Sequence, residues 1–167
     1  MNETSSVNAT SIFDLLSLDN EVFRSYIFYS SLLVMKVFLL VPLTAIQRIK
    51  YMNFANPEDT KIRIGFLPKP SVSLNNEHIE RIRRAHLNDL ENIPFFVFSA
   101  FFYILTGPSV FVATTLFKIV TLLRFVHTFV YAVIVIPQPA RFLSFIIPYF
   151  LMFHMCFTAV IHFWDEN

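Results

Sequence analysis

Glycine, cysteine and charged residues are all scarce in this sequence. It has two glycines and one cysteine among 167 residues, and charged residues make up only 15% of it. A water-soluble domain usually carries about 25% charged residues. The single cysteine, Cys156, excludes an intrachain disulfide framework, and its apolar neighbours predict a buried, unreactive thiol. These shortages argue against a small secreted domain and against a water-soluble enzyme.

Apolar side chains are what the sequence has in abundance. Hydrophobic residues make up 55% of the chain, 21 residues are phenylalanine, and the mean hydropathy is +0.57. So many phenylalanines with so little glycine suit the lipid-facing surface of helices better than a turn-rich β fold. The net charge of +1 gives no reason to expect a nucleic-acid partner. We therefore predict an all-α integral membrane protein in contact with membrane lipids.

Four segments are long enough to cross a bilayer as helices, which takes about 20 mostly apolar residues. Their expected ranges are residues 25–47, 77–106, 109–136 and 142–163. The second segment reaches this length only if its helix begins near Glu77 and brings charged residues to the membrane boundary. Gly107 and Pro108 separate the second and third segments, and Pro137 and Pro139 separate the third and fourth. We expect one membrane domain over residues 1–167, built as a four-helix bundle.

The distribution of basic residues predicts the orientation of these helices. Lysines and arginines gather between the first two spans, around the loop of residues 48–76, whereas the tail has none before Arg24. The positive-inside rule places this loop in the cytosol and both termini on the lumenal side. Two glycosylation sequons begin at Asn2 and Asn8, in the tail that would be lumenal.

Two polar stripes lie on the second and third predicted helices. The first stripe is Arg84, Asn88 and Glu91, and the second is Arg124, Thr128 and Tyr131. Residues at i, i+4 and i+7 share one helix face. Ionisable groups within spans face the bundle interior or a wet cavity, where they find partners. The two stripes therefore predict a pocket for a small anion that carries carboxylates.

Simpler interpretations of the same charges stay open. Arg81, Arg83 and Arg84 fit a basic cluster that touches anionic headgroups. Arg124 fits a structural charge paired with Glu91 or Asp89. Histidines on apolar helices usually serve as hydrogen-bonded packing residues, and lysines there reach the interface or a polar cavity; the residues concerned are His127, His154, Lys36 and Lys118.

Several ordered motifs resemble the family of membrane-associated proteins in eicosanoid and glutathione metabolism. They are Phe-Ala-Asn-Pro-Glu-Asp at residues 54–59, Glu-Arg-Ile-Arg-Arg-Ala-His-Leu-Asn-Asp-Leu-Glu-Asn at residues 80–92, and the group Arg124, His127, Thr128, Tyr131, Pro137-Gln138-Pro139 and Arg141. The resemblance covers the chain from about Asp19 into the fourth helix. Within that family, residues 83–92 are most similar to the microsomal glutathione transferases.

The resemblance implies a homotrimer that binds glutathione as co-substrate at subunit interfaces on the cytosolic side. The glutathione ligands that it implies are Arg48, Arg83, Arg84, His86 and Tyr131, with Asn88 and Glu91 completing the pocket. It places Arg141 beside the reacting sulfur, with Arg124 as the second candidate for stabilising the thiolate. No metal site is implied.

The implied activity is conjugation of glutathione to hydrophobic electrophiles, together with reduction of lipid hydroperoxides. The implied location is the endoplasmic reticulum membrane or the outer mitochondrial membrane. The chain departs from the transferases at Thr60, where they often have a cysteine, so activation through that thiol is not expected. Two rivals within the family are a prostaglandin E synthase-like isomerase and a non-catalytic lipid-presenting scaffold. The isomerases place a serine where this chain has Phe142.

Overall fold

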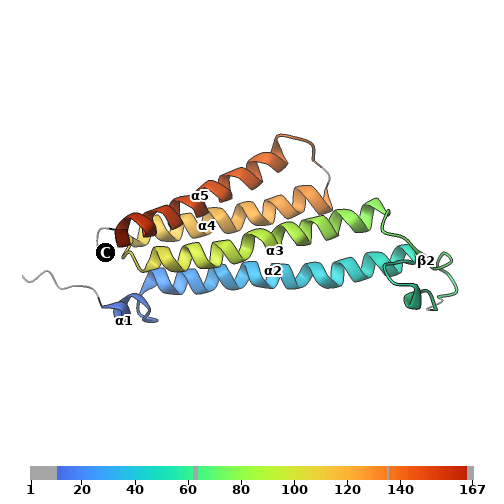
Figure 1. Cartoon of the computed structure of the whole chain (residues 1–167), viewed down its shortest axis with the longest axis horizontal. Coiled ribbons are helices and arrows are strands. Elements are labelled where there is room, and N and C mark those ends of the chain that lie inside the picture. The colour runs from blue at the N-terminus through green and yellow to red at the C-terminus, as the bar shows by residue number, and fades with distance from the viewer. Residues whose placement is uncertain (1–10, 62–63, 135, 165–167) are drawn as a thin grey trace, which may run out of the picture.

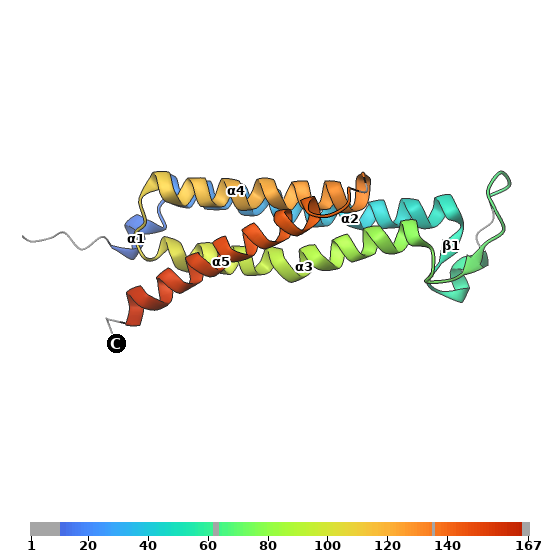
Figure 2. The ribbon, with the colours of Figure 1, turned by 90° about the horizontal axis from the view of Figure 1, so that it is seen from above.

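Four long helices lie side by side in a computed structural model that describes residues 11–61, 64–134 and 136–164. They are α2 (Glu21–Tyr51), α3 (Glu77–Ile104), α4 (Val110–Thr128) and α5 (Ala140–Trp164). Figure 1 shows that they share the long axis of the molecule, and Figure 2 shows α5 crossing the others obliquely. This arrangement confirms the expected helical bundle. The sequons at Asn2 and Asn8 lie outside the described residues.

The helix ends follow local sequence signals. The Asn20 side chain accepts a hydrogen bond from the Val22 N–H at 2.9 Å and caps α2. Asn76 caps α3 in the same way, with its Oδ1 accepting from the N–H of His78 at 3.1 Å. Such caps satisfy backbone donors that a helix start leaves free. Helix α2 therefore begins at Glu21 rather than at residue 25, and α3 begins at Glu77, as expected, well before its apolar half.

A wider turn ends the third long helix. The α-helical part of α4 stops at Thr128, and the chain continues as the π-helical turn η2 (Phe129–Val133). The sequence predicted one regular helix over residues 109–136. Single π-helical turns are rare and often mark functional sites. This one carries Tyr131, which belongs to the second polar stripe.

The loop between α2 and α3 contains short ordered elements where the sequence indicated only turns. Strands β1 (Asn53–Phe54) and β2 (Ser71–Val72) pair in parallel, with Asn53 opposite Ser71. A 3-10 turn, η1 (Pro57–Lys61), lies between them, and a short helix α1 (Ile12–Leu15) precedes α2. The paired strands bring the end of α2 close to the segment that leads into α3.

Three of the long segments are long and apolar enough to cross a membrane, judged by length and composition. They are α2, Val110–Val133 and α5. Helix α3 differs because charged residues run from Glu77 to Glu91, and only its second half is apolar. Large apolar side chains on the outward faces of the bundle are exposed, which suits a lipid environment. The chain is thus a multi-pass membrane protein, and a fourth crossing by α3 is a proposal.

Aromatic packing fills the centre of the bundle. Phe117 of α4 is completely buried, and its ring meets that of Phe96 of α3 edge to face at 6.0 Å between centroids. Tyr26 of α2 approaches the same Phe117 ring at 6.4 Å. Helix association in lipid depends on packing of this kind, because lipid tails are as apolar as the side chains themselves.

Replacement of Phe117 by alanine is expected to lower the stability of the bundle by about 2 kcal/mol. This is less than the roughly 3–5 kcal/mol found in water-soluble cores, since detergent also solvates an exposed ring. Thermal unfolding in detergent measures the change. Phe111→Ala is the matched control, because that ring is 79% exposed on the same helix. Equal losses in the two variants would contradict the assigned core.

Candidate functional site

A completely buried carboxylate lies at the centre of the polar residues. Asp89 of α3 is 0% exposed, and its two cationic partners, Lys36 of α2 and Arg124 of α4, are 4% and 1% exposed. Lys36 Nζ lies 2.7 Å from Asp89 Oδ2, and Arg124 Nη2 lies 2.7 Å from Asp89 Oδ1. We call these three residues the buried triad. A charge placed so deep is tolerated only with partners of this kind.

Further hydrogen bonds extend the buried triad across three helices. Arg124 Nη2 donates to the side-chain oxygen of Asn88 at 2.6 Å, and the Thr128 hydroxyl donates to Asp89 Oδ2 at 3.2 Å. Lys36 Nζ also donates to the backbone carbonyl of Arg124 at 2.8 Å. The sequence left Lys36 as an interfacial or cavity-facing residue and Arg124 as a possible partner of Asp89. The structure places both in one network.

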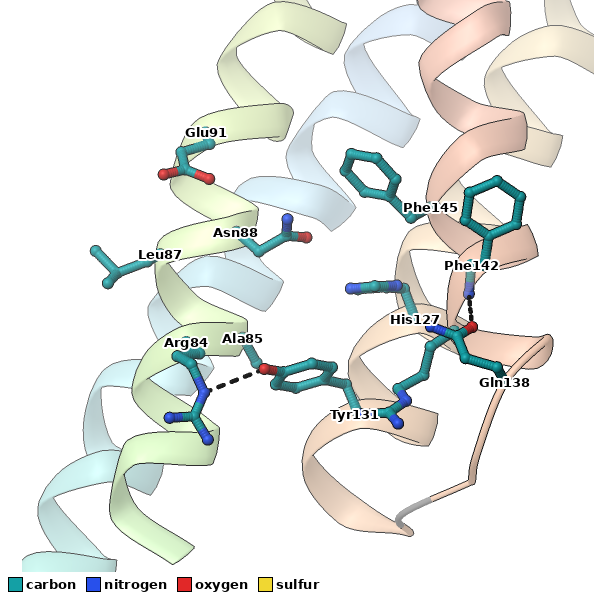
Figure 3. Close-up of a pocket in the computed structure, with 11 residues that line it drawn as sticks. Arg84, Ala85, Leu87, Asn88, Glu91, His127, Tyr131, Gln138, Phe142 and Phe145 are labelled. Carbon is teal, nitrogen blue, oxygen red and sulfur yellow. Dashed lines mark hydrogen bonds between the residues drawn. The ribbon is translucent and has the colours of Figure 1, made fainter. Parts of the chain in front are cut away.

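A cavity of about 530 Å³ opens beside the triad, between α3, η2 and the start of α5 (Figure 3). It is lined by Arg84, Ala85, Leu87, Asn88, Glu91, His127, Tyr131, Gln138, Arg141, Phe142 and Phe145. Polar side chains come from every element that forms the wall. The volume is within the range of small-molecule sites.

Hydrogen bonds and ring contacts fix several of the lining side chains. Arg84 Nε donates to the Tyr131 hydroxyl at 3.1 Å, which joins α3 to η2 (Figure 3). The His127 ring stacks on that of Tyr131 at 5.8 Å, and its Nδ1 lies 3.2 Å from the Ser144 hydroxyl. These contacts hold the aromatic side of the cavity in place before any ligand arrives.

Arg141 is a lining residue with a buried donor that has no acceptor in the part of the chain that the structure describes. Its guanidinium lies over the Tyr131 ring, 5.7 Å from the centroid. Its Nε is buried and has no hydrogen-bond partner among the described residues. A buried guanidinium N–H without an acceptor is costly. Arg141 therefore brings a positive charge to the cavity wall that no described acceptor offsets at Nε.

The structure brings together one part of the expected ligand set. Arg84, Asn88, Glu91, Tyr131 and Arg141 all line the cavity. The first polar stripe therefore lies along one wall, as its spacing predicts. Leu87 and Gln138 appeared only within the matched motifs and Phe142 only as a departure from the isomerases, so none of them was predicted as a ligand, and Phe145 was not named.

Four other expected residues lie elsewhere in the same chain. Arg48 sits in the last turn of α2, where its Nη1 is 3.5 Å from the Asn53 carbonyl oxygen. Arg83 is exposed and pairs with Glu80 at 2.9 Å. Half-buried His86 and fully buried Arg124 are not among the lining residues. Arg124 instead bonds to Asn88, which is a lining residue.

An apolar groove continues from the cavity between α3 and α5. Glu91 and Phe145 belong to both, and the rest of the groove is lined by Phe95, Phe98, Phe102, Phe153, Tyr149, Met152, Cys156, Asn92 and Ser99. The sequence predicted that Cys156 would be buried, but its side chain is exposed along this groove. The prediction was wrong because the outer faces of this bundle are as apolar as its interior, so apolar neighbours do not indicate burial.

Residues 26–161 match the model of the MAPEG family. The chain is 37% identical over 146 residues to microsomal glutathione S-transferase 1 of Rattus norvegicus, and 36% identical over 144 residues to that of Homo sapiens. Each alignment covers 86% of this chain and 92% of the relative. The chain is also 36% identical over 114 residues to prostaglandin E synthase of Bos taurus, covering 68% of this chain and 72% of the relative.

Asp89→Ala is expected to destabilise the bundle by about 3–5 kcal/mol, because it leaves two buried cations without their anion. Thermal unfolding in detergent tests this. Glu80→Ala serves as the control, since the Glu80–Arg83 pair has an exposed arginine and such pairs contribute about 1 kcal/mol or less. A loss for Asp89→Ala no larger than the control's would show that the buried triad does not hold the helices together.

Proposed function

Because the chain belongs to the MAPEG family, we propose that it is a membrane-bound transferase that conjugates glutathione to hydrophobic electrophiles. The observation that carries this proposal is the buried, unpartnered Nε of Arg141 at the wall of the polar cavity. A donor held there without an acceptor is suited to a ligand that brings a negative charge. The glutathione thiolate is such a ligand.

The chemistry of the lining residues fits glutathione. This tripeptide carries two carboxylates and one amine, which call for cationic donors and one acidic acceptor. Arg84 supplies guanidinium N–H groups and Glu91 supplies the carboxylate for the amine. Asn88 and Gln138 supply amide groups at the same wall. The Arg84–Tyr131 hydrogen bond orients the arginine before glutathione binds.

Arg141 is the proposed catalytic residue. A free thiol has a pKa of about 8.5 and attacks only as the thiolate. A guanidinium close to the sulfur favours the anion, and exclusion of water strengthens that effect. The thiol proton passes to solvent. With a chlorinated nitrobenzene, the sulfur forms a bond to the carbon that carries chlorine, and chloride leaves with the electrons of the broken bond.

The same thiolate accounts for a second proposed activity on lipid hydroperoxides. The sulfur attacks the terminal oxygen, the O–O bond breaks, and the lipid alkoxide takes a proton to become an alcohol. A second glutathione then attacks the oxidised sulfur, which gives glutathione disulfide and water. The hydroperoxide is the oxidant, and glutathione supplies both electrons.

The apolar groove is the proposed approach for the electrophile. It meets the polar cavity at Glu91 and Phe145, and it is open along the outer faces of α3 and α5. A hydrophobic substrate dissolved in the bilayer can therefore reach the thiolate without crossing water.

We also propose a homotrimer with sites between subunits. Arg48 does not line the cavity of its own chain, so a second copy would have to bring its Arg48 to the ligand. We further place the loop between α2 and α3 in the cytosol, both termini in the lumen, and the protein in the endoplasmic reticulum or outer mitochondrial membrane. Helix α3 would provide the fourth crossing.

The second candidate function is a glutathione-dependent isomerase, favoured by the identity to prostaglandin E synthase. Its glutathione site would use the same cavity residues. Phe142 stands where those synthases place a serine, so conjugation is the activity to test first. A lipid-presenting scaffold is the third candidate, and it requires no glutathione binding at all.

Arg141→Ala is expected to lower the rate of conjugation of a chlorinated nitrobenzene by about 100-fold, the usual loss on removing one donor to a developing anion. Glutathione binding, measured by calorimetry in detergent, should be weakened much less. Arg24→Ala is the control, since that exposed arginine bonds only to carbonyl oxygens near the start of α2. A wild type that binds glutathione without conjugation would favour the isomerase, and no binding would favour the scaffold.

Mixing two inactive variants tests the shared site. If Arg48 comes from a neighbouring copy, then each trimer that contains both Arg48→Ala and Arg141→Ala chains keeps one intact site in three, because each interface draws one residue from each subunit. Co-expression with two affinity tags and assay of the doubly purified trimers measures this. Activity no higher than that of either variant alone would place both arginines in a single chain.

A further inference from the structure

The buried triad does not balance its charge. Lys36 and Arg124 carry two positive charges and Asp89 carries one negative charge, so the cluster has a net charge of +1. No second carboxylate joins these ion pairs among the described residues. An Asp89–Arg124 pair alone would be neutral, and a buried pair needs no extra cation to be satisfied. Lys36 is therefore the residue whose presence calls for an explanation.

The Arg124 guanidinium also has more hydrogen-bond donors than the described residues around it accept. Its Nη2 makes three hydrogen bonds, to Asp89 Oδ1 and to both oxygens of Asn88. Its Nε and Nη1 are buried without a partner among the described residues. Ionisable groups inside a membrane bundle are expensive and are usually retained for function. The uncompensated charge is suited to a nearby anion.

The triad adjoins the proposed glutathione cavity through two residues. Asn88 lines the cavity and accepts the hydrogen bond from Arg124 at 2.6 Å. His127, which also lines the cavity, is followed in the chain by Thr128, whose hydroxyl donates to Asp89. A charge in the triad therefore acts on the cavity through buried side chains, where screening by water and salt is weak.

We propose that Lys36 is a positioning residue for the transferase reaction, which gives the buried triad the net positive charge that stabilises the glutathione thiolate in the adjoining cavity. This inference rests on the proposed function and goes beyond the direct contact with Arg141. Lys36 lies on α2 and is not a lining residue of the cavity. Its effect is electrostatic and passes through the side chains of α3 and α4.

Other charged and titratable groups face the same cavity. They are Arg84 and Glu91 from α3, His127 from α4, Tyr131 from η2 and Arg141 from α5. All of them stay unchanged when only the triad is altered. A unit charge about 10 Å away, at an effective dielectric constant of about 20, shifts a pKa by about one unit. The triad's contribution is thus measurable against that background.

The experiment varies the net charge of the triad by mutation. For each detergent-purified variant, thiolate absorbance gives the pH midpoint at which bound glutathione loses its thiol proton. Lys36→Gln makes the triad neutral, and we expect its midpoint to rise by about one pH unit. Asp89→Asn makes the net charge +2, and its midpoint should fall by a similar amount. The double variant returns the charge to +1 and should titrate like the wild type.

Lys118→Gln is the matched control, because it removes a lysine charge from an exposed position on α4. Its midpoint should equal that of the wild type. A packing role for Lys36 would change stability or affinity without moving the midpoint in opposite directions for the two single variants. Lys36→Met also makes the triad neutral with an unbranched side chain, and it replaces Lys36→Gln if that variant does not fold.

The outcomes separate the inference from the proposed function. A wild type that forms bound thiolate, together with variants whose midpoints stay at its value, would overturn the role of Lys36 and leave the transferase intact. Midpoints that all shift in one direction would also overturn it. A wild type that binds no glutathione would instead remove the proposed function on which the inference rests.

Discussion

Asp89 is fully buried between α2, α3 and α4, where its carboxylate meets cationic side chains from both neighbouring helices. A carboxylate with no exposure needs donors, and Lys36 and Arg124 supply them from two different helices. Since lipid tails compete equally well for apolar side chains, contacts between apolar faces alone specify helix positions weakly in a membrane. A charged contact with fixed geometry specifies them strongly. The ion pairs therefore fix the register of α2, α3 and α4, and with it the wall that carries Asn88.

The four long helices were predictable because apolar runs and helix breakers mark them directly in the sequence. Gly107 adopts a positive φ of 64° at the turn before α4, as a glycine at that position suggests. The π-helical turn after Thr128 was not predictable, because it leaves the pattern of apolar residues unchanged. The Lys36–Asp89 contact could not be predicted from the sequence for a different reason. The two residues are 53 positions apart, and no periodicity connects residues on separate helices.

The two polar stripes show why helical spacing located one half of the site and not the other. Arg84, Asn88 and Glu91 lie on regular α-helix, so their spacing keeps them on one wall of the cavity. The second stripe crosses from α4 into η2. Arg124 and Thr128 lie on regular α-helix and face Asp89. A π-helical turn has i→i+5 hydrogen bonds and therefore more residues per turn, so Tyr131 faces the cavity instead. Arg48 is a further case, because within its own chain it contacts the Asn53 carbonyl oxygen and does not line the cavity, and it would reach a ligand only in the proposed trimer.

The charged residues in the first half of α3 disfavour insertion into a bilayer, and two of them, Arg84 and Glu91, also line the polar cavity. This first half is too polar to count as a membrane span by composition, since charged residues continue from Glu77 to Glu91. Yet this half supplies a wall of the polar cavity proposed for glutathione, and the apolar half that follows supplies a wall of the groove proposed for the electrophile. The two must meet for a reaction to occur, and they meet at Glu91, where the polarity of α3 changes. A fully apolar α3 would insert more easily and would leave glutathione no place beside the bilayer. The ion pairs with α2 and α4 hold the polar half of α3 inside the bundle, next to the point where the cavity and the groove meet.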